Sequence, residues 1–257
     1  MIKLGPAGTG ENSEAGLQKI KELGLDGVEI EFVYGVRMSI ANAKYLGELA
    51  SKLGLKLSVH APYYINLASE EKHKREASLK RILESCERGH YLTAKYIVFH
   101  AAFYGKMDKE EVYQIVKKAI LEMQAIIQQN AWNVQLAPET TGKGSQFGTL
   151  DELLRLHKET GCSLCVDFAH LLARDGRIDY DEILKKLDGL KEVHCHFSGI
   201  EYTEKGERKH LITEKAAIKK LFEKLLKSKT NFMIINESPE SIEDSIKSKE
   251  VLKELGQ

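Results

Sequence analysis

The sequence has little of what marks secreted, membrane-spanning or strongly charged proteins. Its cysteines number four in 257 residues, too few for a disulfide-stapled scaffold, and they favour a reducing compartment. No run of 18 apolar residues is present, so no membrane-spanning helix is expected. The first ten residues also lack the basic and apolar segments of a signal peptide. We therefore predict a cytoplasmic protein that does not enter a membrane.

A surplus of charge is also missing. The 38 Lys and Arg residues balance the 38 Asp and Glu residues, so the formal net charge is zero. Without a global positive field, any anionic partner must be met by a local basic patch. The hydrophobic fraction of 42% is ordinary for a chain that buries a core.

Short β-rich runs alternate with longer amphipathic segments along the whole chain. Eight such runs are predicted as strands: residues 2–5, 27–32, 56–60, 96–100, 133–137, 163–167, 192–196 and 232–236. The segments between them repeat their apolar residues every three or four positions, which is the helical period. Eight βα units indicate either a closed barrel or a doubly wound sheet. The glycine-rich phosphate loops typical of the wound sheet are missing, and no linker divides the chain. We therefore predict a single α/β domain over residues 1–257, a (β/α)₈ TIM barrel.

Polar side chains collect where these strands end. The strand ends and the segments that follow them supply His60, His100, Glu139, Asp167, His170, His196, His210 and Glu237. Because the carboxyl ends of all strands in a barrel meet at one rim, we expect these side chains to surround a common opening. Crowded carboxylates repel one another unless a cation lies between them. Imidazole and carboxylate ligands suit zinc, manganese or iron, and eight exceed the needs of one tetrahedral zinc, which indicates two or three metal ions.

Each of these residues also has an ordinary structural explanation. A single histidine at a strand end is most often a hydrogen-bonded structural residue, and Asp167 or Glu237 alone would cap a helix. A metal centre is favoured because six strands all supply histidine or acidic residues at the same end. His194 shares a strand face with His196 but lies deeper, so we interpret it as a core residue. The motif Cys162-x-x-Cys165 precedes the rim and has no second pair, so we interpret it as structural.

Four segments carry a family resemblance: HAPYYINLA, APETTGKGSQFGTLDELL, VDFAHLLARDG and INESP. They resemble the endonuclease IV family of apurinic/apyrimidinic endonucleases, within the xylose isomerase-like barrel superfamily. The resemblance covers most of the chain and implies three zinc ions, with manganese as an alternative. It assigns His60, His100 and Glu139 to the first ion, Glu139, Asp167, His196 and Glu237 to the second, and His170 and His210 to the third.

The third site departs from the family pattern. The family has an aspartate two residues before the histidine that corresponds to His210, and this chain has Arg208 there. Glu207 stands one residue earlier and offers a replacement carboxylate.

The resemblance also implies an activity and a partner. The activity is hydrolysis of the phosphodiester on the 5′ side of an abasic site in double-stranded DNA, with Glu139 and Glu237 as catalytic residues. Tyr63 and Tyr64 occupy the place of the family residues that enter the duplex. Donors for phosphate lie on the expected rim loops: Arg37, Lys143, Ser145, Gln146, Lys205, Arg208 and Lys209. A monomer suffices for this function.

Two other classes of protein remain open. A sugar isomerase or epimerase of the same superfamily would use Glu139, Asp167, His196 and Glu237 around one metal ion, with the glutamates as acid and base. Such an enzyme has no need of four further imidazoles. The third class is a metal-binding or nucleic-acid-binding protein without catalytic activity, which the departure at Arg208 keeps open.

Overall fold

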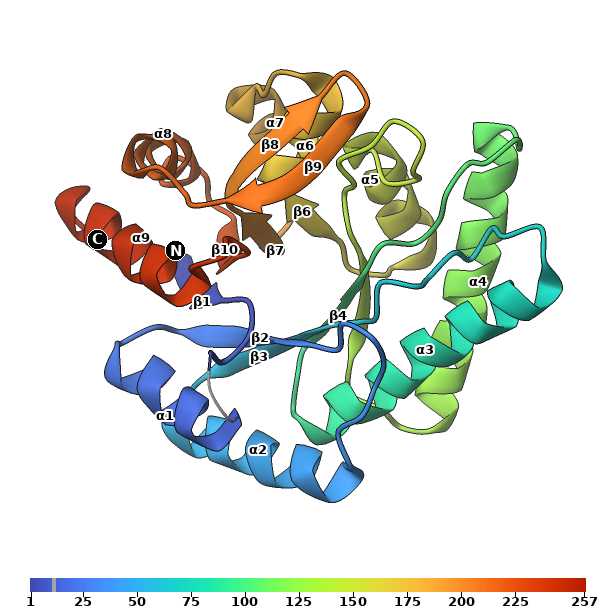
Figure 1. Cartoon of the computed structure of the whole chain (residues 1–257), viewed down its shortest axis with the longest axis horizontal. Coiled ribbons are helices and arrows are strands. Elements are labelled where there is room, and N and C mark those ends of the chain that lie inside the picture. The colour runs from blue at the N-terminus through green and yellow to red at the C-terminus, as the bar shows by residue number, and fades with distance from the viewer. Residues whose placement is uncertain (11–12) are drawn as a thin grey trace.

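Eight parallel strands surrounded by helices form the protein in the computed structural model, which describes residues 1–10 and 13–257 (Figure 1). The strands are β1 Ile2–Pro6, β2 Gly27–Glu31, β3 Lys56–His60, β4 Tyr96–Phe99, β5 Gln135–Pro138, β6 Cys165–Asp167, β7 Glu192–Phe197 and β10 Asn231–Asn236. They coincide with the eight predicted runs, with shifts of up to two residues at the ends of β5 and β6.

The strands close into a barrel through two narrow seams. The ladder β1-β10-β7-β6 and the ladder β2-β3-β4-β5 each hold four strands. Parallel bridges from Ala7 to Glu29 and from Glu139 to Cys165 join β1 to β2 and β5 to β6. This closure confirms the predicted TIM barrel and excludes the doubly wound sheet.

Nine helices in the described part of the chain cover the outside of the barrel (Figure 1). They are α1 Ser13–Glu22, α2 Ile40–Leu53, α3 Lys72–Tyr91, α4 Lys109–Gln129, α5 Leu150–Thr160, α6 Phe168–Asp175, α7 Tyr180–Lys186, α8 Lys215–Leu225 and α9 Ser241–Glu254. Local sequence sets their ends: Thr149 and Glu152 form a capping box before α5, and Gly161 ends that helix with φ +72°. Among the described residues, no helix has the length and apolar character needed to cross a bilayer.

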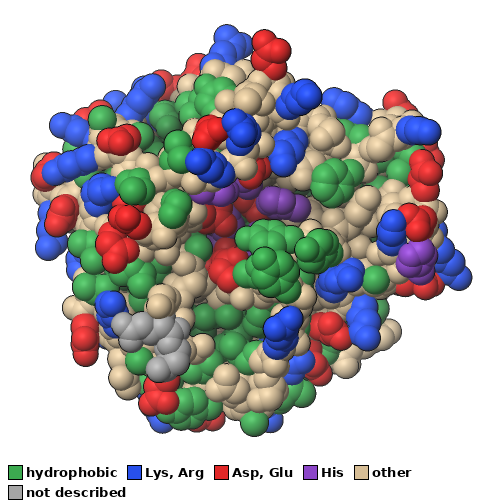
Figure 2. All heavy atoms as spheres, in the orientation of Figure 1, with side chains coloured by type: hydrophobic (Ala, Val, Ile, Leu, Met, Phe, Trp, Pro, Cys, Tyr) green, Lys and Arg blue, Asp and Glu red, His purple; other side chains and the backbone are tan. Residues whose placement is uncertain are grey.

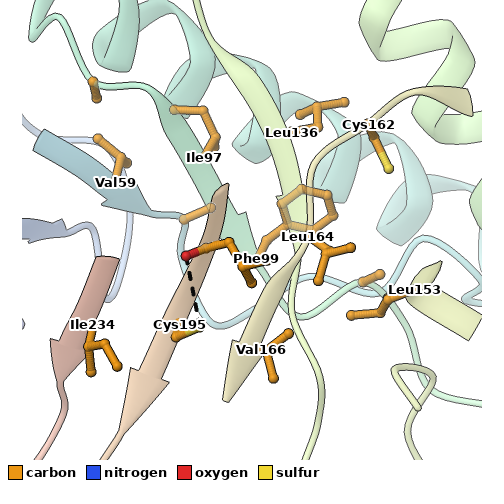
Figure 3. Packing of buried hydrophobic residues seen from close by; sticks show 14 of the residues in the cluster. Val59, Ile97, Phe99, Leu136, Leu153, Cys162, Leu164, Val166, Cys195 and Ile234 are labelled. Atoms are coloured by element: carbon orange, nitrogen blue, oxygen red, sulfur yellow. Dashed lines mark hydrogen bonds between the residues drawn. The ribbon is translucent and has the colours of Figure 1, made fainter. Parts of the chain in front are cut away.

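The barrel wall separates two layers of apolar packing. Strand residues that face outward, among them Val59, Phe99 and Val166, pack with Leu153 of α5 and with Cys162 in one continuous cluster (Figure 3). Inside the barrel a small cluster holds Tyr96, Val98, Ala137 and Cys165. The two cysteines of the CxxC motif therefore belong to different layers, and both are free and buried.

An antiparallel hairpin after β7 was not predicted. Strands β8 Gly199–Thr203 and β9 Gly206–Leu211 pair with each other and pack on α6, so His210 lies in a strand and not in a loop. Tyr202 pairs with Glu207 and Glu201 pairs with Lys209, which leaves Arg208 as the extra residue of a β-bulge. The segment GERKH has polar side chains on both faces of the strand. Apolar periodicity therefore gives no signal for a hairpin there.

Candidate metal centre

The eight residues predicted as metal ligands meet at the carboxyl end of the barrel. Figure 2 shows histidine and acidic side chains gathered in a hollow at the centre of this face. Three groups of them have ligand atoms within 4.8 Å of one another. The groups are His60, His100 and Glu139; Glu139, Asp167, His196 and Glu237; and Asp167, His170 and His210. These are the three sets that the family resemblance implied, with Asp167 added to the third.

Glu139 lies at the centre of this arrangement. Its Oε2 is 3.1 Å from Nε2 of His60 and 2.9 Å from Nε2 of His100, and its Oε1 is 3.1 Å from Nδ1 of His196 and 3.2 Å from Nδ1 of His170. Burial alone would raise the pKa of this carboxyl, but the neighbouring imidazoles, His100 and His196 first, hold it well below its usual value. An ionised carboxylate with both oxygens directed at different imidazole groups is suited to bridge two cations.

Asp167 has one oxygen committed to the fold and one left over. Oδ1 caps α6 by accepting a hydrogen bond from the backbone N–H of His170, while Oδ2 is buried without a hydrogen-bond partner. Burial, reinforced by Glu237 and Glu139, raises the pKa of Asp167 to about 6. A cation beside Oδ2 would offset the free-energy cost of burying an ionised oxygen without a partner. Oδ2 of Asp167 is therefore suited to be a metal ligand.

Three of the imidazoles are oriented by hydrogen bonds to backbone carbonyls or a hydroxyl. Nδ1 of His60 is 2.8 Å from the carbonyl of Ala61, and Nδ1 of His170 is 2.9 Å from the carbonyl of Thr140. Nδ1 of His210 is 2.6 Å from Oγ of Ser198. Because a carbonyl oxygen can only accept a hydrogen bond, Nδ1 of His60 and of His170 carries a proton, and Nε2 is the nitrogen that each ring could offer to a cation. Nε2 of His170 is buried and has no hydrogen-bond partner.

The β-bulge decides which hairpin residues reach the third group. Arg208 points away, with its side chain 63% exposed and its Nη1 2.9 Å from Oε1 of Glu201. Oε2 of Glu207 instead lies 3.4 Å from Nε2 of His170. The loop after β5 fixes this position, because the Glu207 backbone N–H donates to the Gly142 carbonyl at 3.0 Å. A Cβ at Gly142 would lie 2.6 Å from the Cβ of Glu207, so the close approach requires glycine there.

Two glutamates of β2, one buried and one half-buried, were missed by the sequence analysis. Glu29 has no exposed surface and contacts His194 and His196 through its two oxygens, at 2.8 Å each. Glu31, beside His60 in the strand register, has a buried Oε1 without a partner, and burial raises its pKa to about 8. Both lie within the run VEIEF, and two glutamates spaced by two in an apolar strand were the available signal.

The residues predicted to contact DNA differ in accessibility. Tyr63 is 57% exposed and Tyr64 64%, and the Tyr63 ring lies 6.1 Å from the His60 ring. Most of the predicted phosphate donors are exposed or half-buried on the rim: Arg37, Lys143, Ser145, Lys205, Arg208 and Lys209. Gln146 differs, since it is buried with its Oε1 unpartnered.

Arg174 of α6 holds the loop that carries Lys143 and Gln146. Its Nη1 donates to the carbonyls of Thr141 and Lys143 at 3.2 and 2.7 Å, and Nη2 donates to the carbonyl of Gln146 at 3.0 Å. Nη1 also donates to the hydroxyl of Thr141 at 2.9 Å. One side chain therefore fixes the path of the loop beside the centre.

A TIM barrel with clustered imidazoles and carboxylates at its carboxyl end defines the class of this protein, and comparison with known proteins specifies it further. Residues 17–255 match the model of the xylose isomerase-like TIM barrel family. The chain therefore belongs to that family. It is 37% identical over 225 residues to an uncharacterized protein of Methanocaldococcus jannaschii, an alignment that covers 82% of this chain and 81% of the relative.

Relatives with a named activity match less of the chain. A probable endonuclease 4 of Mycoplasma mobile is 32% identical over 144 residues, which is 52% of this chain and about half, 50%, of that protein. Endonuclease IV from Thermus thermophilus superposes with a TM-score of 0.74 at 21% identity, covering 98% of this chain and 99% of that one. A D-tagatose 3-epimerase-like protein gives 0.71 at 24% identity, covering 98% and 96%. These two superpositions support the fold alone.

Proposed function

We propose that the protein is a zinc-dependent endonuclease that hydrolyses the phosphodiester 5′ to abasic sites in double-stranded DNA. The observation that carries this proposal is the position of Glu139 between four imidazoles, with three groups of ligand atoms around it. A one-metal sugar epimerase would need only the group formed by Glu139, Asp167, His196 and Glu237. The partial similarity to probable endonuclease 4 proteins supports the same choice.

The donor set fits two or three zinc ions. His60, His100 and Glu139 would hold one ion, and Glu139, Asp167, His196 and Glu237 a second, with Glu139 between them. The third group would take Asp167, His170 and His210, and Glu207 of the hairpin is the nearest further carboxylate. When bound, the ions would act as Lewis acids on the phosphate and on the attacking water.

The remaining roles belong to side chains of the chain itself. Glu237 lies 3.2 Å from His196 with part of its side chain exposed, so it can accept a proton from a water that approaches phosphorus. Tyr63 and Tyr64 are exposed beside the hollow and can stack on bases next to a flipped-out nucleotide. Arg37, Lys143 and Arg208 supply positive charge for the DNA backbone on a protein without net charge. We also propose that the chain is one domain and acts as a monomer in the cytoplasm.

The test joins metal analysis to two activity assays. Purified protein should contain more than one zinc ion per chain and cut an abasic-site duplex without added magnesium. Glu139→Gln should lower both the zinc content and the rate, the rate by about 100-fold or more, because the carboxylate contacted by four imidazoles loses its charge. Glu70→Gln, an exposed carboxylate before α3, is the matched control and should change neither.

The epimerase alternative gives a different result in the same experiments. One metal ion per chain, interconversion of ketose epimers and an intact abasic duplex would favour it over the nuclease. Its support is the single group of Glu139, Asp167, His196 and Glu237, which is enough to hold one metal ion.

A further inference from the structure

We propose that Glu29 is a positioning residue that fixes the His196 ring in the metal centre, and that His194 in turn holds Glu29. The inference rests on the proposed metal centre and assigns functions to two residues that contribute no atom to its three ligand groups. Oε1 of Glu29 is 2.8 Å from Nε2 of His196, and Oε2 is 2.8 Å from Nε2 of His194. On its other side, Nδ1 of His196 is 3.1 Å from Glu139 and 3.2 Å from Glu237.

The two nitrogens of His196 therefore face different surroundings. Nδ1 faces the carboxylates of the proposed centre, and Nε2 faces Glu29 inside the barrel. Nε2 of His196 and Oε1 of Glu29 form no aligned hydrogen bond, so their contact at 2.8 Å is an electrostatic contact between the imidazole ring and the carboxylate. A carboxylate in this position holds a proton on Nε2, which makes Nδ1 the nitrogen that the ring could offer to a cation.

The location of Glu29 argues against a purely structural role. It has no exposed surface, and it lies in the barrel interior that also holds the apolar cluster of Val98, Ala137 and Cys165. Burying a carboxylate there is costly unless partners compensate it. The partners are two imidazoles, which occupy one oxygen each. An apolar side chain would fill the barrel as well as Glu29 does. Orienting His196, in contrast, requires a hydrogen-bond acceptor at this position.

Removing a carboxylate that accepts the ring N–H of a metal-binding histidine typically lowers metal affinity 10- to 100-fold. Glu29→Gln keeps the shape of the side chain but offers one acceptor oxygen for two ring N–H groups. Its NH₂ group would then oppose the N–H of one imidazole. We expect zinc to bind the variant roughly 10- to 100-fold more weakly, measured by competition with a chromophoric chelator.

Ser58→Ala is the matched control. Ser58 is the register partner of Glu29 on β3, and its hydroxyl is buried without a hydrogen-bond partner. Removing that hydroxyl alters the inside of the barrel beside Glu29 without removing a hydrogen bond from Glu29 or from either histidine. The control should bind zinc like the wild-type protein. An equal loss in Ser58→Ala and Glu29→Gln would reduce Glu29 to a structural residue and overturn the proposal.

A second measurement does not depend on the folding of any variant. Nitrogen-15 NMR of the metal-free wild-type protein should find a proton on Nε2 of His196, and Nε2 without a proton would overturn the proposal. The outcomes also separate this inference from the proposed function. If the wild-type protein binds no zinc, the proposed metal centre fails. If it binds zinc and Glu29→Gln binds it equally well, only the role of Glu29 fails.

Discussion

Glu207 and His170 face each other beside the third ligand group, with Oε2 of the glutamate 3.4 Å from Nε2 of the imidazole. The bulge at Arg208 makes this possible, since residues 207 and 210 would point to opposite faces of a regular strand. We predict that Glu207→Gln lowers the zinc content by one ion per chain, because a neutral amide is a poorer ligand than a carboxylate. Metal analysis of the dialysed protein measures this.

The matched control for this change is Glu204→Gln. Glu204 is exposed in the turn of the same hairpin, between β8 and β9, and its loss should leave the zinc content unchanged. If the Glu207→Gln protein keeps the full wild-type zinc content, the carboxylate lies near the third group but does not bind a metal ion there.

The contrast between Glu207 and Glu139 shows how far the sequence could predict the site. Barrel topology requires strand ends to meet at one rim, so His60, Glu139 and Glu237 could be grouped from the sequence alone. The position of Glu207 depends on a bulge and on the close approach of Gly142, and neither has a periodic signal in sequence.

Glu29 was missed for a different reason. Barrel topology groups the residues at the carboxyl ends of strands, while Glu29 lies within β2 below the rim. An apolar run that contains glutamate at every second position indicates a buried polar partner, but the identity of that partner depends on register across the barrel. His194 is 165 positions away in the chain, so the sequence alone could not join the two.

The two exposed tyrosines beside His60 lead to a prediction about DNA binding. Stacking of a base on an aromatic ring contributes about 1 to 3 kcal/mol. Tyr63→Ala and Tyr64→Ala should therefore each weaken binding to an abasic duplex by roughly 5- to 100-fold while the zinc content stays constant. Fluorescence anisotropy with a labelled duplex measures the affinity.

Tyr45→Ala controls for the loss of an exposed aromatic residue elsewhere. Tyr45 is 48% exposed on the outer helix α2, so its replacement should leave DNA affinity unchanged. Equal affinities for the Tyr63, Tyr64 and Tyr45 variants would mean that the duplex does not contact the tyrosines beside the centre.

Arg174 provides a prediction about the loop after β5. Its guanidinium donates to three carbonyls and one hydroxyl of residues 141–146, a geometry that a lysine ammonium does not reproduce. Arg174→Lys should destabilise the protein by about 2 to 4 kcal/mol and raise KM for abasic DNA, because Lys143 loses its fixed position. Urea unfolding and steady-state kinetics measure the two effects. Arg177→Lys, an exposed arginine just after α6, should change neither, and a stable Arg174→Lys protein with unchanged KM would contradict the role.

Glu31 gives the metal-free protein a pH dependence whose sign follows from its raised pKa. Burial raises this pKa to about 8, from an ordinary value of 4.5 in the unfolded chain. Below pH 4.5 the carboxyl is neutral in both states and costs nothing. Between pH 4.5 and 8 the unfolded chain ionises while the folded state still holds its proton, so stability is lost over this range and stays low above pH 8, where the folded state carries the charge. Glu31→Gln should therefore stabilise the metal-free protein by roughly 2 to 4 kcal/mol at pH 9 and by almost nothing at pH 4.5.

Urea unfolding of the metal-free protein across this pH range tests the prediction directly. Glu48→Gln, which removes an exposed charge from α2, should shift stability little at either end of the range. The difference between the Glu31 variant and the wild type must grow with pH, because a raised carboxyl pKa permits only that sign. A difference that shrinks with pH would mean that cationic neighbours such as His60 stabilise the ionised form, and Glu31 would then resemble Glu139.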